Sequence, residues 1–140
     1  MNYTVAVATK DDLPWLCSRA NAKEEGIWAL KAMDSNWVIK GMMGLETVTP
    51  NMTMVHMAFD EPMAARALLP PICQIGFKRG RYGLATIPGY NEKSIRFAKK
   101  AGFREVSRIR DGWSPGIDMV TLILDRAECR FLSQDERKVA

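Results

Sequence analysis

One short segment carries the side chains best suited to proton transfer. His56 is the only histidine of the chain and lies within residues 53–60 (TMVHMAFD), with Asp60 and Glu61 at the end of that segment. An imidazole ordinarily titrates near neutral pH, so His56 could accept a proton from a nucleophile, and the two carboxylates are rival bases. A lone histidine in an apolar segment more often has a packing role, so both roles stay open for His56.

These residues need a strand to position them, and the segment has the pattern of one. Side chains alternate between the two faces of a strand, which places Val55, Met57 and Phe59 on one face. His56 falls on the opposite face. The segment therefore predicts a strand that presents His56 away from its larger apolar neighbours.

The most clearly delimited element is a cationic helix over residues 91–101 (NEKSIRFAKKA). Asn91 is a favoured N-cap, and Gly102 can adopt the left-handed conformation that ends a helix, with Phe103 as its hydrophobic contact. Residues 82–87 and 103–110 predict strands on either side of this helix. A turn at 111–116 leads into a further strand at 117–124.

The N-terminal half has a less regular pattern. It predicts a strand over residues 3–8, a helix over residues 9–22, a second short helix over residues 27–33 and a strand over residues 36–42. Pro70 and Pro71 lack the amide hydrogen that a helix interior needs. A helix that starts near Pro62 is therefore expected to stop near Leu69, or to restart with Pro71 in its first turn.

Composition limits the classes of function. The chain has 140 residues and a net charge of +4, and no apolar run approaches the roughly 20 residues that cross a bilayer. Its three cysteines are widely spaced, which argues against a disulfide framework or a zinc site and fits a reducing cytoplasm. Ten basic and two acidic residues lie between Gly76 and Arg110. Such a field could attract a polyanionic ligand, although a solvated surface is an equally ordinary explanation.

A family resemblance rests on the C-terminal half. Residues 91–104 (NEKSIRFAKKAGFR), followed by a strand and by RIRDG at 108–112, resemble the closing part of a GCN5-related N-acetyltransferase (GNAT) domain. The similarity is to divergent members of phage type and to ribosomal-protein acetyltransferases. It implies an α/β (α+β) fold with a mixed sheet of about six to seven strands and about four flanking helices. We expect residues 1–132 to form this single domain and residues 133–140 to be a polar tail.

The resemblance also implies direct transfer of an acetyl group from acetyl-CoA to an amine, such as a protein N-terminus, a lysine or a small amine. In GNAT domains the strand equivalent to residues 53–60 splays from its neighbour towards the pantetheine arm, and a glycine-containing loop holds the pyrophosphate. Residues 62–67 (PMAARA) stand in the place of that loop, with Ala65 and Ala67 where glycines are usual. Arg66 could offer charge to the phosphates, but these residues also suit the first turn of an ordinary helix.

Two sets of candidate site residues follow from the resemblance. The catalytic candidates are His56, Asp60 and Ser94; the cofactor-binding candidates are Met57, Ala58, Phe59, Ala65, Arg66, Ala67, Asn91 and Ser94; no metal site is expected. Many GNAT domains carry a tyrosine, acting as an acid, at the position of Ala98. That role would pass here to Ser94, Tyr90, Ser114 or water, and Asn91 has helix capping as a competing role.

A second function stays open: a GNAT-fold protein without catalysis that binds a protein partner, as a phage structural or host-modulating component. The altered loop, Ala98 and the two prolines favour it. The expected partners of the enzyme are acetyl-CoA and an amine or protein substrate, in the cytoplasm, which is the host cytoplasm for a phage-encoded protein. A membrane partner is not expected, nucleic acid is disfavoured, and a homodimer is left open.

Overall fold

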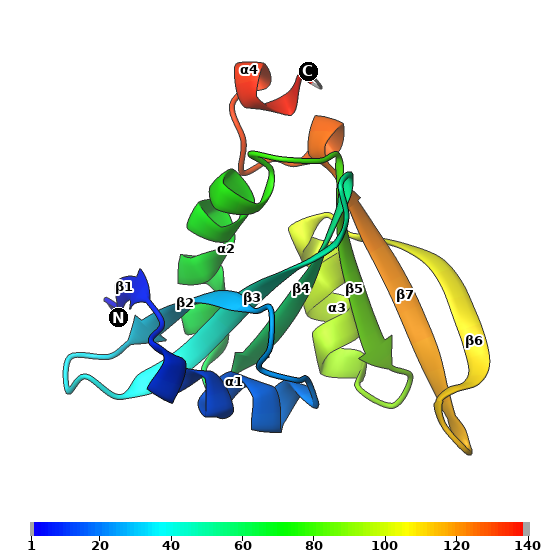
Figure 1. Ribbon diagram of the computed structural model, residues 1–140, viewed down its shortest axis with the longest axis horizontal. Coiled ribbons are helices and arrows are strands. Elements are labelled where there is room, and N and C mark those ends of the chain that lie inside the picture. The colour runs from blue at the N-terminus through cyan, green and yellow to red at the C-terminus, as the bar shows by residue number, and fades with distance from the viewer. Residues whose placement is uncertain (1, 139–140) are drawn as a thin grey trace.

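The computed structural model describes residues 2–138, which fold into one mixed sheet with flanking helices (Figure 1). The strands are β1 Thr4–Val7, β2 Trp28–Met33, β3 Ile39–Thr49, β4 Met52–Phe59, β5 Tyr82–Pro88, β6 Arg104–Ser114 and β7 Ile117–Asp125. The helices are α1 Leu13–Ala20, α2 Pro62–Gly76, α3 Glu92–Ala101 and α4 Gln134–Arg137, with 3-10 turns at Lys10–Asp12 and Arg126–Glu128.

The seven strands lie in the order β1-β2-β3-β4-β5-β7-β6. Only the β4–β5 pair is parallel among the strands of the described chain; the other neighbours are antiparallel. This confirms the predicted fold class. The strands predicted over residues 53–60, 82–87 and 117–124 are β4, β5 and β7, whereas the one predicted at 36–42 begins later and continues to Thr49 as β3.

Two apolar clusters place the helices on opposite faces of the sheet. Consecutive residues of β3 show the division, because Met43 packs in the main cluster with α2 and α3, and Met42 packs with Leu16 of α1. On β4, Val55, Met57 and Phe59 contact the main cluster, as their alternation predicted. The face of β4 that carries His56 is therefore the α1 face.

The helix predicted over residues 27–33 is wrong, because residues 28–33 form β2. This strand pairs with β1 on one side and β3 on the other. Its side chains are apolar on both faces: Leu30 and Ala32 pack against the main cluster, and Ala29 packs against α1. A short run that is apolar on both faces has no period that separates a strand from a helix.

The expected break at the two prolines is also wrong, since α2 runs without interruption from Pro62 to Gly76. Each interior proline costs roughly 3 kcal/mol in an isolated helix. Three fully or almost fully buried residues beside them, Leu68, Leu69 and Ile72, each contribute roughly 1.5–3 kcal/mol on burial. Packing of α2 against the sheet therefore offsets the cost of Pro70 and Pro71.

The helix predicted over residues 91–101 is confirmed as α3, with Asn91 as its N-cap and Gly102 at its C-terminal end. The side chain of Asn91 accepts a hydrogen bond from the amide of Ser94 (3.2 Å), and Gly102 ends α3 with φ of +112°. Phe103 is buried beyond it. Within the predicted polar tail, Ser133 caps α4, while residues 139–140 lie outside the described residues. No helix in the described part of the chain is both long and apolar enough to span a bilayer.

Candidate active site

The parallel pair β4–β5 opens into a cleft. The two strands pair at Met52–Tyr82, Thr53–Gly83 and Met54–Leu84, and their pairing ends there although both strands continue. Figure 1 shows β4 and β5 starting side by side and diverging towards their C-terminal ends. The facing edges of residues 55–59 and 85–88 are thus separated, which makes their backbone groups accessible to a ligand.

A polar cleft of about 340 Å³ occupies this opening. Its walls come from the two diverging strands, the end of α1, the start of α3 and the β6–β7 hairpin. The lining residues are Ser18, Arg19, Ala20, Asn21, Val55, His56, Met57, Ala85, Thr86, Ile87, Pro88, Tyr90, Asn91, Ser94 and Trp113. Four of the sequence-predicted site residues, His56, Met57, Asn91 and Ser94, therefore meet in one place.

His56 is held by a carboxylate that the sequence analysis missed. Its Nε2 lies 2.8 Å from Oε1 of Glu46 on β3, and the two side chains are 14% and 41% exposed. In the β3–β4 register Gly44 is opposite His56 and Glu46 is opposite Met54, so Glu46 is the diagonal neighbour of His56. Counting back through the hairpin at residues 50–51 could have found it.

The start of α3 supplies the opposite wall. Capping uses Oδ1 of Asn91, and both Asn91 and Ser94 are half-buried where they line the cleft. Ala98, at the position of the usual tyrosine, is fully buried in the main cluster. Tyr90 is 70% exposed and lines the cleft, whereas Tyr3 and Tyr82 do not, so Tyr90 is the tyrosine that could act as the acid in place of Ala98.

The end of α1 closes the third side. The guanidinium of Arg19 lies 3.8 Å from the ring centroid of Trp15, and its Nε lies 3.6 Å from Oδ1 of Asp60. Asp60 is about half exposed and is engaged in this ion pair. It does not line the cleft, so its geometry for proton transfer is poorer than that of His56.

The start of α2 has a different character. Pro62 in the first turn has no amide hydrogen, and Ala64 and Ala65 are fully buried, with Cβ of Ala64 3.0 Å from the position of a Cβ on Gly41. Arg66 is exposed and makes a long contact with the sulfur of Met63 (3.9 Å). Ala65, Arg66 and Ala67 do not line the cleft, and neither do Ala58 and Phe59.

The carboxylate of Glu61, the residue before α2, is engaged by two residues from the N-terminal half of the chain. Glu61 lies 3.7 Å from Nζ of Lys40 on β3 and accepts a hydrogen bond from the hydroxyl of Tyr3. This hydrogen bond and the negative charge of Glu61 raise the pKa of Tyr3 to about 12. The start of α2 has no glycine cradle, so its residues do not fit the pyrophosphate of acetyl-CoA in the way that the family resemblance implies.

Solved structures share this architecture. Spermidine/spermine N-acetyltransferase SpeG from Vibrio cholerae superposes with a TM-score of 0.70 at 11% identity, covering 89% of this chain and 95% of that one. The ribosomal-protein-S18-alanine N-acetyltransferase from Escherichia coli gives 0.69 at 18% identity, covering 89% and 94%. The chain has the GNAT fold. No protein-family profile and no curated protein matches the sequence.

A third similar structure, smu.2055 from Streptococcus mutans, gives a TM-score of 0.71 at 15% identity and covers 87% of this chain and 98% of that one. At such identities the likeness defines the GNAT fold and its layers. The chemistry of the cleft has to be argued from the residues that line it in this chain.

Proposed function

We propose that this GNAT-fold protein is an N-acetyltransferase that moves an acetyl group from acetyl-CoA to a primary amine. The observation that carries the proposal is that His56, which lines the β4–β5 cleft, is paired with Glu46 at 2.8 Å. A base held by a carboxylate, in a cleft open to solvent, is the arrangement that deprotonates a bound ammonium group.

His56 is the base in this proposal and Glu46 orients it. With Nε2–H donated to Glu46, Nδ1 is the nitrogen that accepts the proton of the incoming amine. Glu46 also stabilises the imidazolium that results. Asp60 is the weaker candidate because Arg19 engages it outside the cleft.

The other cleft residues bind the donor and complete the transfer. Acetyl-CoA supplies the acetyl group as a thioester, whose carbonyl carbon bonds to the amine nitrogen as the carbon–sulfur bond breaks. The edge of β4 is unpaired beyond Met54, and the backbone of Met57, which lines the cleft, would face the pantetheine arm and the developing oxyanion; Ala58 and Phe59, beyond the cleft lining, would contact a more distant part of the arm. In this proposal Asn91 holds the arm from the α3 side, and the Ser94 hydroxyl, which also lines the cleft, passes a proton from water to the leaving thiolate. If the pyrophosphate lies at the first turn of α2, exposed Arg66 is the residue of that turn that would pair with it, since Ala65 is buried and Ala67 is half-buried.

An acceptor panel tests the proposal. The purified chain is mixed with acetyl-CoA and, in separate reactions, spermidine, a peptide with an alanine N-terminus and a lysine peptide with a blocked N-terminus, and released thiol is measured. We expect release with at least one acceptor class and its loss in His56→Ala. Absence of release with every amine, together with the absence of thermal stabilisation at millimolar acetyl-CoA, would exclude the proposal, because a ligand that binds only the native state must stabilise it.

The start of α2 favours a second candidate, a GNAT-fold protein that binds a protein partner without catalysis. Buried Ala64 and Ala65 and the carboxylates of Asp60 and Glu61 do not suit a diphosphate. For this candidate, acetyl-CoA gives no calorimetric heat and His56→Ala leaves partner binding intact. For either candidate we infer a cytoplasmic site of action, consistent with three buried free thiols at Cys17, Cys73 and Cys129.

A further inference from the structure

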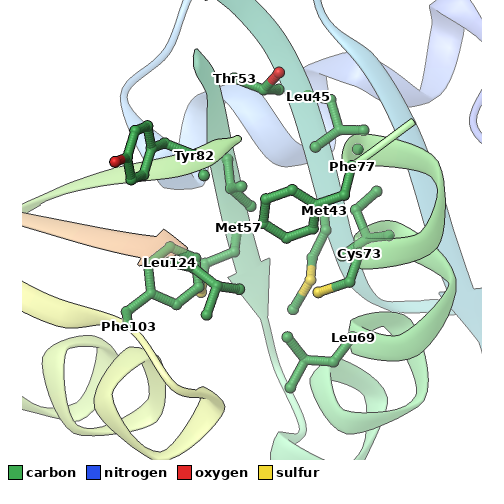
Figure 2. Close-up of a pocket in the computed structure, with 14 residues that line it drawn as sticks. Met43, Leu45, Thr53, Met57, Leu69, Cys73, Phe77, Tyr82, Phe103 and Leu124 are labelled. Carbon is green, nitrogen blue, oxygen red and sulfur yellow. The ribbon is translucent and has the colours of Figure 1, made fainter. Parts of the chain in front are cut away.

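A second cavity lies on the α2 face of the sheet, beside the part of β4 and β5 that is still paired (Figure 2). It has a volume of about 30 Å³ and is walled by α2, β3, β4, β5 and the end of β7. In Figure 2 the rings of Phe77 and Phe103 and the side chains of Met43, Leu69 and Leu124 surround the same space. No charged residue lines it within the described chain.

This cavity and the polar cleft share a wall. Val55 and Met57 line both of them. Both lie on β4 within three residues after Met54, where the pairing of β4 with β5 ends. The cavity therefore adjoins the end of the cleft at which β4 and β5 are still paired, and the side chains of Val55 and Met57 stand between the two spaces.

We propose that the cavity receives the end of a donor acyl chain longer than acetyl, so that the preferred donor is propionyl-CoA or butyryl-CoA. This inference rests on the proposed function and specifies its donor. A volume of about 30 Å³ corresponds to roughly two water-sized spheres, which is room for about one to two additional methylene groups. An apolar cavity of this kind stays dry, so an acyl chain enters without displacing bound water.

The composition of the wall supports an alkyl occupant. Met43 and Met57 are unbranched and adaptable, and their side chains adjust to a chain that varies by one carbon. The lining residues with a polar side chain are Thr53, Tyr82 and Cys73, and no Asp, Glu, Lys, Arg or His lines the cavity in the part of the chain that the structure describes. A donor with a carboxylate at the end of its acyl group is therefore excluded from this space.

The first experiment compares donors on the unaltered protein. The values of kcat/KM are measured with acetyl-, propionyl-, butyryl- and octanoyl-CoA and one fixed amine. Each buried methylene is expected to raise kcat/KM about fourfold up to butyryl. Octanoyl-CoA, which exceeds the volume, should fall below acetyl-CoA. Butyryl-CoA should also raise the melting temperature more than acetyl-CoA at equal concentration.

The decisive variant is Gly83→Ala. Gly83 lies in the β4–β5 register opposite Thr53 and lines the cavity, and a Cβ there would be 3.7 Å from Cβ of Leu124 and 3.7 Å from Cζ of Phe77. These are ordinary contacts, so the methyl group fills the cavity without displacing its neighbours. We expect Gly83→Ala to keep the rate with acetyl-CoA and to abolish the advantage of butyryl-CoA. Val48→Ala, at an exposed site, is the matched control and should leave the donor ratio unchanged.

The outcomes separate the two levels of the proposal. Acetyl-CoA as the best donor, or a Gly83→Ala variant that changes all donors alike, would overturn the donor assignment and leave the proposed acetyl transfer standing. A failure of every donor to react or to stabilise the protein would overturn the acyltransferase itself. A butyryl preference that disappears in Gly83→Ala supports both.

Discussion

Two helices begin beside the C-terminal ends of diverging strands, and their first turns are built differently. At α3, Asn91 caps the helix and faces the cleft together with Ser94. At α2, the first turn is fixed to the sheet by buried Ala64 and Ala65, and Glu61 is tied to Lys40 and Tyr3. The α3 start combines capping with a place in a cleft, whereas the α2 start has the features of a packed junction. The comparison shows that position in a fold does not by itself make a helix start a binding site.

The largest effect on kcat is expected at His56 in the cleft, and Asp60, just before α2, provides the comparison. His56→Ala should lower kcat by about 100-fold to 10,000-fold, because it removes the general base. Asp60→Asn, the matched control at the end of the same strand, should lower kcat by less than about threefold, since an exposed ion pair contributes little. The measurement is initial rate against amine concentration for both variants. A larger loss of kcat in Asp60→Asn than in His56→Ala would show that Asp60, and not His56, is the general base.

Glu46→Gln tests the orientation of the base. Glutamine keeps the size of Glu46 but loses the charge that stabilises the His56 imidazolium, so we expect kcat to fall by roughly tenfold, between the effects of the other two variants. A purely structural role would change stability and leave the pH profile unchanged. The pH dependence of kcat/KM should therefore shift in Glu46→Gln relative to the unaltered protein.

The next effect separates capping from binding at the α3 start. Asn91→Asp retains an oxygen that accepts from the amide of Ser94, whereas Asn91→Ala removes it and should cost about 1 kcal/mol of stability. Both variants lose the side-chain amide, so both should raise the Kd for acetyl-CoA about fivefold or more. Thermal melting and calorimetry give the two quantities separately. If Asn91→Asp has the same Kd for acetyl-CoA as the unaltered protein, Asn91 caps α3 and does not bind the ligand.

A smaller effect is expected at Arg66. The side chain is exposed, and within residues 2–138 its one hydrogen-bond contact is to the sulfur of Met63, so Arg66→Ala should leave the melting temperature almost unchanged. If the α2 start holds the diphosphate, the Kd for acetyl-CoA rises about threefold to tenfold, and more at low salt. Arg79→Ala is the control, because it removes the same charge beyond the C-terminal end of α2. Equal effects of the two variants would show only general electrostatic attraction.

The smallest effect concerns the junction between β1 and α2. The pKa of Tyr3 is raised to about 12 in the folded protein by its hydrogen bond to Glu61. The stabilisation is therefore complete below about pH 10, the ordinary tyrosine value, and is lost as the pH rises towards the folded value. Tyr3→Phe should melt slightly lower at pH 7, and its deficit should shrink above about pH 10. Its affinity for acetyl-CoA should be unchanged.

The sequence allowed the central elements to be predicted because their signals are local. The alternation in residues 53–60 and the cap and terminating glycine of α3 each depend on neighbours in the chain. The error at residues 27–33 has a different origin, because β2 is buried on both faces and its apolar residues show no period. The continuous α2 could not be predicted either, since tertiary packing decides whether a helix tolerates Pro70 and Pro71.

The candidate site was only partly accessible from the sequence. His56, Met57, Asn91 and Ser94 come together in the cleft, but Glu46 becomes the partner of His56 only through the β3–β4 register. The end of α1 with Arg19, and Trp113 on the β6–β7 hairpin, also reach the cleft from distant parts of the chain. Such contacts depend on how the sheet and helices assemble and leave no local signature.

Hydrogen exchange with and without acetyl-CoA tests most directly whether the diverging strands form a thioester site. Amides of residues 55–59 on β4 and of residues 91–95 at the α3 start should exchange more slowly when acetyl-CoA is present, because the ligand covers that edge and wall. Amides of β1 and β2, on the far edge of the sheet, should be unaffected. Protection that appears only outside the cleft, or none at millimolar acetyl-CoA, would contradict the assignment of this cleft to acyl transfer.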